Sequence, residues 1–240
     1  MSLFARISDI DLADESSWKG KIFLTLDIDW AADFVLADTI ALLERAGVPA
    51  TWFATHPTPL LARIGANPLF EIGVHPNFNP LLFAGAQGDV NAVVRDVLAL
   101  APGCRAVRSH SVAQSTGILA AFAREGLQYD CNMLIPWDSG MTLRPWRYWE
   151  GKMVRVPYHW EDDVACLYGW PLGDDTDYWY QPEGINVLDF HPIHLYLNSD
   201  SLDRYEASRA VHGNGDKLLA FRCNSVGVRT FLENLLVRHL

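Results

Sequence analysis

The sequence predicts an α/β fold built on a parallel sheet, and three observations lead to this class. Residues 21–30 begin as an apolar, β-branched run, which is typical of a strand buried on both faces of a parallel sheet, and they end in two carboxylates. Strand-like and helix-like patterns then alternate as far as residue 125, which specifies a parallel sheet with right-handed crossovers. Of the 240 residues 50% are hydrophobic, so a single domain over residues 1–240 can bury a substantial core.

The first half of the chain supplies the regular part of this sheet. An amphipathic helix is predicted over residues 33–46, because Phe34, Ile40 and Leu43 fall on one face and Gly47 can end the helix. Further strands are predicted at residues 50–55, 71–75 and 104–109, and further helices at residues 59–64, 89–100 and 115–125.

The second half of the chain is less regular. Its predicted strands are short and are separated by long loops rich in Trp, Tyr, Pro and Asp; such loops are usually functional or poorly ordered, and the aromatic residues favour order. The strands are predicted at residues 129–134, 153–156 and 186–190, and two closing helices at residues 201–211 and 225–237, the second capped by Asn224.

The charge of the chain excludes several classes of partner. The formal net charge is −10 and the sequence pI is about 5.1, with no basic cluster, so binding to nucleic acid or to an anionic membrane surface is not expected. No apolar run approaches the length of a membrane span.

Two features favour a cytoplasmic location. The first 18 residues carry five charges and no apolar segment of the secretory type, although a removed leader would leave no trace. The four cysteines lack any CxxC spacing and lie mostly in apolar segments, as reduced core cysteines do. They are Cys104, Cys131, Cys166 and Cys223.

The two carboxylates that end the first strand predict a functional site. Asp27 and Asp29 lie two residues apart, so in a continued strand they point to the same side. Buried carboxylates need a partner, and a divalent metal, an Arg or both can provide it. The alternative is a helix N-cap, which explains Asp29 or Asp33 but leaves Asp27 unexplained.

Other polar residues also follow predicted strands. They are His75, Arg108, His110 and His191. In a parallel α/β barrel the carboxyl ends of the strands meet at one mouth, where active sites are built. We therefore expect these side chains to converge on the two aspartates.

These strand-end motifs resemble the polysaccharide deacetylase family, the NodB-like carbohydrate esterases, over roughly residues 21–198. The resemblance implies a single irregular (β/α) barrel of seven or eight strands. It also implies roles for the first motif, Thr25-Leu26-Asp27-Ile28-Asp29: Asp27 is the expected catalytic base and Asp29 a metal ligand.

The second motif of the family has two His residues four apart. This chain keeps the first, His75, and has Asn79 in place of the second. The resemblance thus implies a divalent metal, with zinc as the first choice, held by Asp29, His75 and Asn79. The Asn carbonyl oxygen is a weaker donor to zinc than imidazole, and Asn79-Pro80 can alternatively be a simple turn.

The third motif supplies an Arg that orients the catalytic Asp. Arg108 fits this role, although Ser109-His110-Ser111 replaces the usual following Pro. An Arg beside Asp27 would hold it ionised; the alternative is that Arg108 pairs with a structural carboxylate. His110 is a candidate substrate contact or a core histidine.

The late motifs supply the general acid and its support. His191 follows a strand and is the expected acid, with His194 as a substrate-binding or supporting residue. Asp162 is the expected support, chosen from three consecutive acidic residues that can alternatively form a solvated loop, and Trp160 is expected to form a pocket wall.

The expected function is metal-dependent hydrolysis of an N-acetyl or O-acetyl group on a sugar or polysaccharide precursor. Two alternatives stay open: hydrolysis of a non-sugar, ureide-like amide, and carbohydrate binding without catalysis. The oligomeric state is left open. We expect two or three tryptophans to face the substrate, from a set comprising Trp137, Trp146, Trp149, Trp160, Trp170 and Trp179.

Overall fold

The computed structural model describes residues 2–84, 87–148, 151–173 and 177–240. Within them the strands form one nine-stranded sheet in the order β6-β7-β5-β4-β3-β2-β1-β9-β8, in which only β6 runs antiparallel to its neighbour. The strands are β1 (Ile22–Asp27), β2 (Ala50–Ala54), β3 (Phe70–Val74), β4 (Ala106–Val107), β5 (Tyr129–Leu134), β6 (Trp146–Arg147), β7 (Val154–Tyr158), β8 (Trp160–Glu161) and β9 (Asn186–Phe190).

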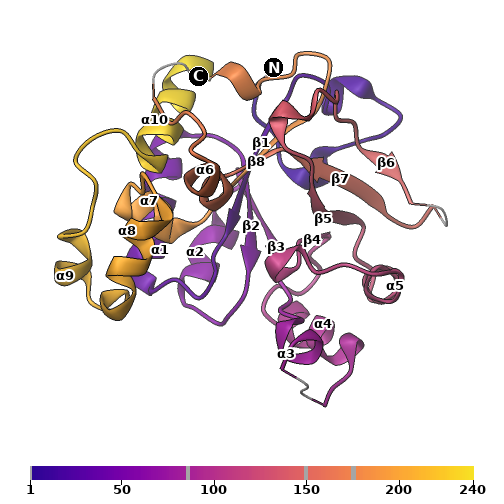
Figure 1. The fold of residues 1–240 in the computed structure, drawn as a ribbon. Coiled ribbons are helices and arrows are strands. Elements are labelled where there is room, and N and C mark those ends of the chain that lie inside the picture. Colours follow the sequence, from indigo (N-terminus) through magenta and orange to yellow (C-terminus); the bar gives the residue numbers. More distant parts are fainter. Residues whose placement is uncertain (1, 85–86, 149–150, 174–176) are drawn as a thin grey trace.

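Helices cover the outside of this sheet. They are α1 (Asp33–Ala46), α2 (Leu60–Ala66), α3 (Asn79–Leu82), α4 (Val90–Leu98), α5 (Thr116–Arg124), α6 (Asp162–Tyr168), α7 (Pro192–Leu197), α8 (Leu202–Ser208), α9 (Gly215–Leu219) and α10 (Val228–His239). In Figure 1 α1, α2 and α7 to α10 gather on one side of the strands, and α3 to α5 lie toward the β3–β5 side. None of the helices in the described ranges combines the length and apolar character needed to cross a membrane.

The predicted α/β class is confirmed: the parallel-rich sheet curls into a half-barrel. The chain itself joins β7 near one end of the sheet to β8 at the other end, with only His159 between them. The His159 N–H donates to the carbonyl oxygen of Val187 in β9 at 3.3 Å, so the chain that leaves β7 lies against the strand next to β8.

Prediction of the individual elements succeeded where the pattern is long and periodic. The bounds of α1, β5 and β9 agree with the predicted ranges, whereas β4 has only two residues and the short helices α6, α7 and α9 were not predicted. The cap of the last helix was also predicted wrongly. Gly227, not Asn224, precedes α10. This position requires glycine, because a Cβ at residue 227 would lie 2.1 Å from the carbonyl oxygen of Asn198.

Side chains of β1 alternate between two environments. Ile22, Leu24 and Leu26 pack outward against the helices, and Phe23 packs into the interior of the curled sheet. The following inward position, Thr25, is polar and fully buried, and Asp27 continues this polar side. The apolar interior therefore changes to a polar one toward the carboxyl ends of the strands, where β1 stops.

The prediction that Trp160 forms a pocket wall is wrong. Tyr158 packs in the interior cluster, but Trp160 packs in the outer core, fully buried and stacked on Phe231 with ring centroids 4.3 Å apart. The regular two-residue alternation is interrupted at His159, between β7 and β8. This interruption turns Trp160 away from the interior.

Candidate active site

Asp27 and Asp29 both point into the mouth of the curled sheet, but the backbone between them is not a continued strand. β1 ends at Asp27, and Asp29 and Trp30 have φ angles of 33° and 53°. Left-handed conformations cost non-glycine residues on the order of 1–3 kcal/mol each and concentrate at functional sites. The N-cap of α1 is Ala32, so neither carboxylate caps that helix.

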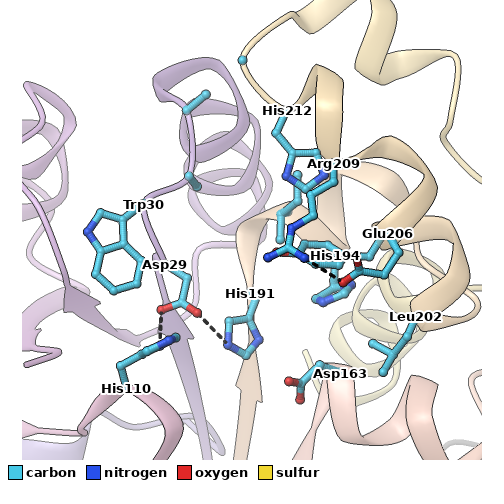
Figure 2. Close-up of a pocket in the computed structure, with 15 residues that line it drawn as sticks. Asp29, Trp30, His110, Asp163, His191, His194, Leu202, Glu206, Arg209 and His212 are labelled. Atoms are coloured by element: carbon cyan, nitrogen blue, oxygen red, sulfur yellow. Dashed lines mark hydrogen bonds and ion pairs between the residues drawn. The ribbon is translucent and has the colours of Figure 1, made fainter. Parts of the chain in front are cut away.

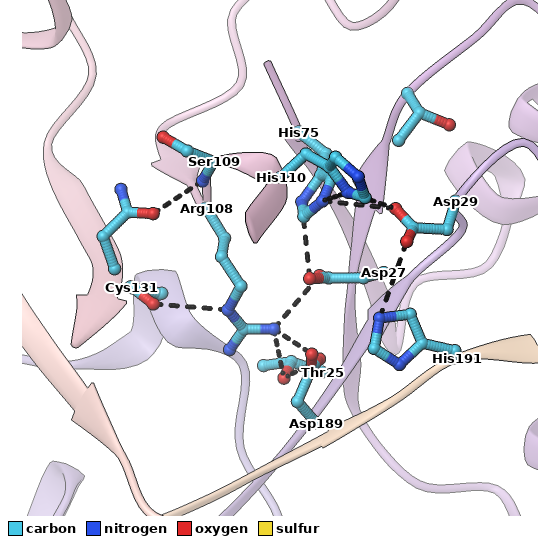
Figure 3. A network of polar contacts seen from close by, with 12 residues as sticks. Thr25, Asp27, Asp29, His75, Arg108, Ser109, His110, Cys131, Asp189 and His191 are labelled. Carbon is cyan, nitrogen blue, oxygen red and sulfur yellow. Dashed lines mark hydrogen bonds and ion pairs between the residues drawn. The ribbon is translucent and has the colours of Figure 1, made fainter. Parts of the chain in front are cut away.

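Three potential ligand atoms face one another beside Asp29. Its Oδ1 lies 3.3 Å from both His75 Nε2 and His110 Nδ1, and these two nitrogens are 3.4 Å apart (Figure 3). The Asp29 oxygen is buried and accepts no well-aligned hydrogen bond from the described residues. Although burial raises the pKa of Asp29, the two imidazoles outweigh it and hold this pKa well below its usual value.

These donors fit a divalent metal. Two imidazole nitrogens and one carboxylate oxygen are a common protein ligand set for zinc, with a further position left open. The geometry also qualifies Asp29, His75 and His110 as one of three groups of potential metal ligands in the described residues.

His110 lies where Asn79 was expected. The Asn79 amide group donates to Ser111 Oγ at 3.0 Å, and Asn79 lines neither of the cavities described below. Ser111 belongs to the short 3-10 turn His110–Val112, so Asn79 supports the turn that carries His110. Ligation by Asn79 stays a prediction, whereas His110, predicted as a substrate contact, faces the other two ligand atoms.

Arg108 lies against Asp27, as the sequence predicted. Its Nη1 donates to Asp27 Oδ1 at 3.1 Å, to Thr25 Oγ1 at 3.0 Å and to Asp189 Oδ1, while Nε donates to the carbonyl oxygen of Cys131 at 3.2 Å (Figure 3). Arg108 also has a structural carboxylate partner, which was the alternative prediction, because it bridges Asp27 and Asp189. Asp189 is fully buried and was not predicted as a site residue.

The surroundings of Arg108 set the electrostatics of Asp27. The guanidinium carbon lies 4.8 Å from the centre of the Phe53 ring and 4.5 Å from that of Tyr158. Burial, followed by the charge of Asp189, raises the pKa of Asp27 well above its usual value, and Arg108 offsets part of this rise. A carboxylate with a raised pKa is a stronger base than an exposed one.

The buried arrangement around Arg108 predicts a large stability loss on Arg108→Met. This substitution leaves Asp27 and Asp189 without their shared cation, and breaking such a buried group costs about 3–5 kcal/mol. Urea denaturation measures this loss as a decrease in the free energy of unfolding. The matched control is Arg105→Met, whose guanidinium donates to exposed Gln128, for which about 1 kcal/mol is expected. Equal losses in the two variants contradict the interpretation.

His191 follows β9 and is held by Asp162. The Nδ1 of His191 lies 2.7 Å from Asp162 Oδ1, and its backbone N–H donates to Asp162 Oδ2 at 2.7 Å. His191 Nε2 lies 3.7 Å from Asp29 Oδ2. Burial lowers the pKa of His191, but the Asp162 carboxylate outweighs burial and brings this pKa well above 6.5.

The acidic residues on either side of Asp162 also belong to the site, which the sequence did not resolve. Glu161 Oε2 accepts a hydrogen bond from the Tyr158 hydroxyl at 2.9 Å, and Asp163 Oδ1 is buried without a partner among the described residues. With His191 they form another group of potential ligand atoms. Burial first, and then their mutual repulsion, raises the pKa of Glu161.

Two cavities meet at these residues. The inner cavity, of about 100 Å³, contains Asp27, His75 and Arg108 in its lining. The outer cavity, of about 690 Å³, extends toward α8 (Figure 2). Both are lined by Asp29, His110, Asp163 and His191.

His194 lines the outer cavity but is almost fully buried. Its Nδ1 lies 3.0 Å from Ser199 Oγ, and burial together with the charge of His191 lowers its pKa to about 3. It therefore presents a neutral imidazole to the cavity. Substrate binding by His194 stays a prediction.

The predicted set of substrate-facing tryptophans does not match the cavities. Trp149 lies outside the described residues, and the other five predicted tryptophans line neither cavity. Trp30, which was not in the set, lines the outer cavity and is 47% exposed. Its position directly after Asp29 was the signal that could have identified it.

Comparisons with known proteins find similar proteins over most of the chain. A family model described as "WbmS-like: Polysaccharide deacetylase" matches residues 24–209. The chain is 64% identical to a Bordetella bronchiseptica protein, WbmS, which has a crystal structure and is described as a "putative polysaccharide deacetylase involved in o-antigen biosynthesis". The match covers 99% of this chain and 98% of that chain, with a TM-score of 0.97.

Two further solved structures are more distant. A peptidoglycan N-acetylglucosamine deacetylase is 16% identical over 72% of each chain, and a CE4 family pseudoenzyme from Bacillus anthracis is 12% identical over 87% of this chain and 63% of that chain. Both have a TM-score of 0.44. The search of curated proteins found no match.

Proposed function

The chain belongs to the WbmS-like polysaccharide deacetylase family and is therefore a hydrolase of carbon–nitrogen bonds other than peptide bonds, and from this premise we propose that it removes an N-acetyl or O-acetyl group from a sugar in a metal-dependent reaction. One observation carries the proposal. Asp29 lines a cavity of about 100 Å³ together with Asp27 and His191, and Asp27 is bonded to Arg108 while His191 is bonded to Asp162.

Asp29, His75 and His110 would hold the metal, and we propose zinc because of the mixed imidazole and carboxylate donors. When bound, such an ion supplies a Lewis acid toward the acyl carbonyl oxygen and toward water.

Asp27 is the proposed general base. Arg108 fixes one of its oxygens at 3.1 Å and favours the ionised form, while burial and Asp189 strengthen its basicity. The other oxygen, Oδ2, lies 3.4 Å from His75 Nδ1, which keeps the carboxylate beside the proposed ligands. Asp27 can therefore take a proton from water that attacks the acyl carbon.

His191 is the proposed general acid. Asp162 orients the imidazole through Nδ1, which leaves Nε2 directed toward Asp29 and the cavity. The Asp162 carboxylate raises the pKa of His191 and so favours the protonated ring, which can donate a proton to the departing nitrogen. An amide needs this step because an unprotonated amine anion is a poor leaving group.

The contact between Asp162 and His191 predicts how kcat depends on pH. A protonated His191 loses its proton as pH rises through its raised pKa, which sets an alkaline limb in kcat. Asp162→Asn removes the charge that raises this pKa, so we expect the alkaline limb to move by about one unit or more to lower pH. Steady-state pH profiles measure the shift, with Asp216→Asn on α9 as the control. An unmoved limb in Asp162→Asn contradicts the assignment of His191 as the acid.

Release of acetate tests the proposed function directly. Protein stripped of metal and then loaded with zinc, cobalt or nickel is incubated with N-acetylated and O-acetylated sugars and, separately, with cyclic ureides. Acetate from a sugar only after loading supports the proposal. Turnover of ureides alone supports the non-sugar amide alternative, and sugar binding without turnover under every metal supports the non-catalytic one.

We extend the proposal to the substrate and its compartment. The Bordetella bronchiseptica relative is described as involved in O-antigen biosynthesis, and by analogy we propose a precursor of a surface polysaccharide as the substrate here, acted on in the cytoplasm. Recovery of the native protein in a periplasmic fraction would contradict the proposed cytoplasmic location.

A further inference from the structure

Trp30 is placed unusually for a large apolar side chain. It is 47% exposed, lines the outer cavity, and immediately follows Asp29, which lines both cavities. Its ring meets only one other aromatic ring among the described residues, that of His110, edge to face at 5.1 Å (Figure 2). About half of the Trp30 surface therefore stays exposed, and the residue lines the outer cavity.

The backbone holds Trp30 in this position under strain. Both Asp29 and Trp30 have positive φ angles, and a positive φ is a clear outlier for a bulky residue. The Trp30 N–H donates to Thr55 Oγ1 at 3.1 Å, which fixes the turn. The same turn thus holds Asp29, which lines both cavities, and Trp30, which lines the outer one, and strained residues of this kind cluster at functional sites.

The wall that faces Trp30 is polar. In Figure 2 Glu206, Arg209 and His212 lie across the outer cavity from the indole. Arg209 and Glu206 form an ion pair at 3.1 Å and both are more than half exposed, so each retains hydrogen-bonding capacity toward the cavity. One flat apolar wall and one hydrogen-bonding wall match a pyranose ring, which has a face of C–H groups and an edge of hydroxyl groups.

The volumes of the two cavities indicate which part of the substrate each of them can hold. The inner cavity, of about 100 Å³, has room for an acyl group, whereas the outer one, of about 690 Å³, has room for a sugar ring. A sugar whose acyl group reaches Asp27 and His191 must pass Asp29, and the indole of the next residue then lies beside its ring.

We propose that Trp30 is the stacking platform for the pyranose ring of the substrate and a determinant of specificity for sugars. The inference rests on the proposed function for the identity of the substrate class, but it concerns binding and can be tested without turnover.

Binding of defined sugars to variants tests the platform. Zinc-loaded wild type, Trp30→Phe and Trp30→Ala are titrated by calorimetry with the methyl glycosides of N-acetylglucosamine, N-acetylgalactosamine and N-acetylmannosamine. We expect Trp30→Ala to weaken the Kd of the bound sugar about tenfold or more, and Trp30→Phe to weaken it less, because a smaller ring retains part of the stacking surface. Where a sugar is turned over, KM should rise more than kcat falls.

Trp146 provides the matched control. It is 37% exposed, lies on β6 and lines neither cavity, so Trp146→Ala should bind sugars as the wild type does. Metal content and thermal unfolding are measured on every variant. Loss of zinc from Trp30→Ala and Trp30→Phe would overturn the proposal, since it would show that Trp30 only orients His110.

The remaining outcomes are also decisive. An unchanged Kd in Trp30→Ala overturns the proposal that Trp30 stacks on the sugar ring. A wild type that binds none of the three sugars overturns it as well. Weaker binding in Trp30→Ala with no acetate released by the wild type supports the platform and contradicts the proposed deacetylation, so the two failures are distinguishable.

Discussion

Replacing Asp27 by Asn is expected to lower kcat by about a hundred- to ten-thousand-fold, the contribution usual for a general base. Asn has nearly the same shape and can still accept a hydrogen bond from Arg108, so the fold should persist. Zinc content should also persist, because the proposed ligands are Asp29, His75 and His110. Initial rates on an acetylated sugar, elemental analysis and circular dichroism measure the three quantities.

Asp203→Asn is the control for the Asp27 experiment. Asp203 is an exposed residue in the first turn of α8, so its replacement should leave the rate and the metal content unchanged. If Asp27→Asn loses the metal, Asp27 is a ligand and not the base. If it keeps full activity, another group accepts the proton.

Replacing Asp29 by Ala is expected to remove the metal and, with it, turnover. Its Oδ1 is the one atom within 3.3 Å of both imidazole nitrogens in this group, so the site loses its only carboxylate. Mutating residues that merely support a ligand already weakens metal affinity by about ten- to a hundredfold, so loss of a ligand should cost at least about a hundredfold. Metal per chain after dialysis against a weak chelator measures the loss, with about one ion expected in the wild type.

Asp163→Asn is the informative comparison, because Asp163 belongs to the other group of potential ligands around His191. We expect it to retain zinc. Loss of zinc in Asp163→Asn but not in Asp29→Ala would assign the metal to the group of Glu161, Asp163 and His191. A wild type that takes up no zinc, cobalt or nickel contradicts the metal-dependent mechanism.

The sequence could predict the parts of the site that follow directly from strands. Asp27, Asp29, His75, Arg108 and His191 all lie at or just beyond the carboxyl ends of parallel strands, and topology alone brings such residues together. Helix α1 was predictable for a similar reason, since its apolar period is long and Gly47 ends it in a left-handed conformation.

Other parts depend on backbone geometry that the sequence does not reveal. His110 reaches Asp29 through a turn in which Ser111 and Val112 have positive φ angles, without any Gly to indicate it. Trp160 turns outward because strand alternation is interrupted at His159. Asp189 did have a signal, because a carboxylate within an apolar strand needs a buried partner.

The pairing of β1 with β9 also has a consequence for biosynthesis. Thr25 and Asp189, which share a hydrogen bond, are 164 residues apart, so the two strands cannot pair until most of the chain has left the ribosome. Until then one edge of β1 lacks a partner, and Asp27 and Arg108 lack Asp189. Folding dominated by such distant contacts is slow, and an unpaired strand edge is prone to association. The nascent chain therefore has a long interval in which protection by chaperones matters most.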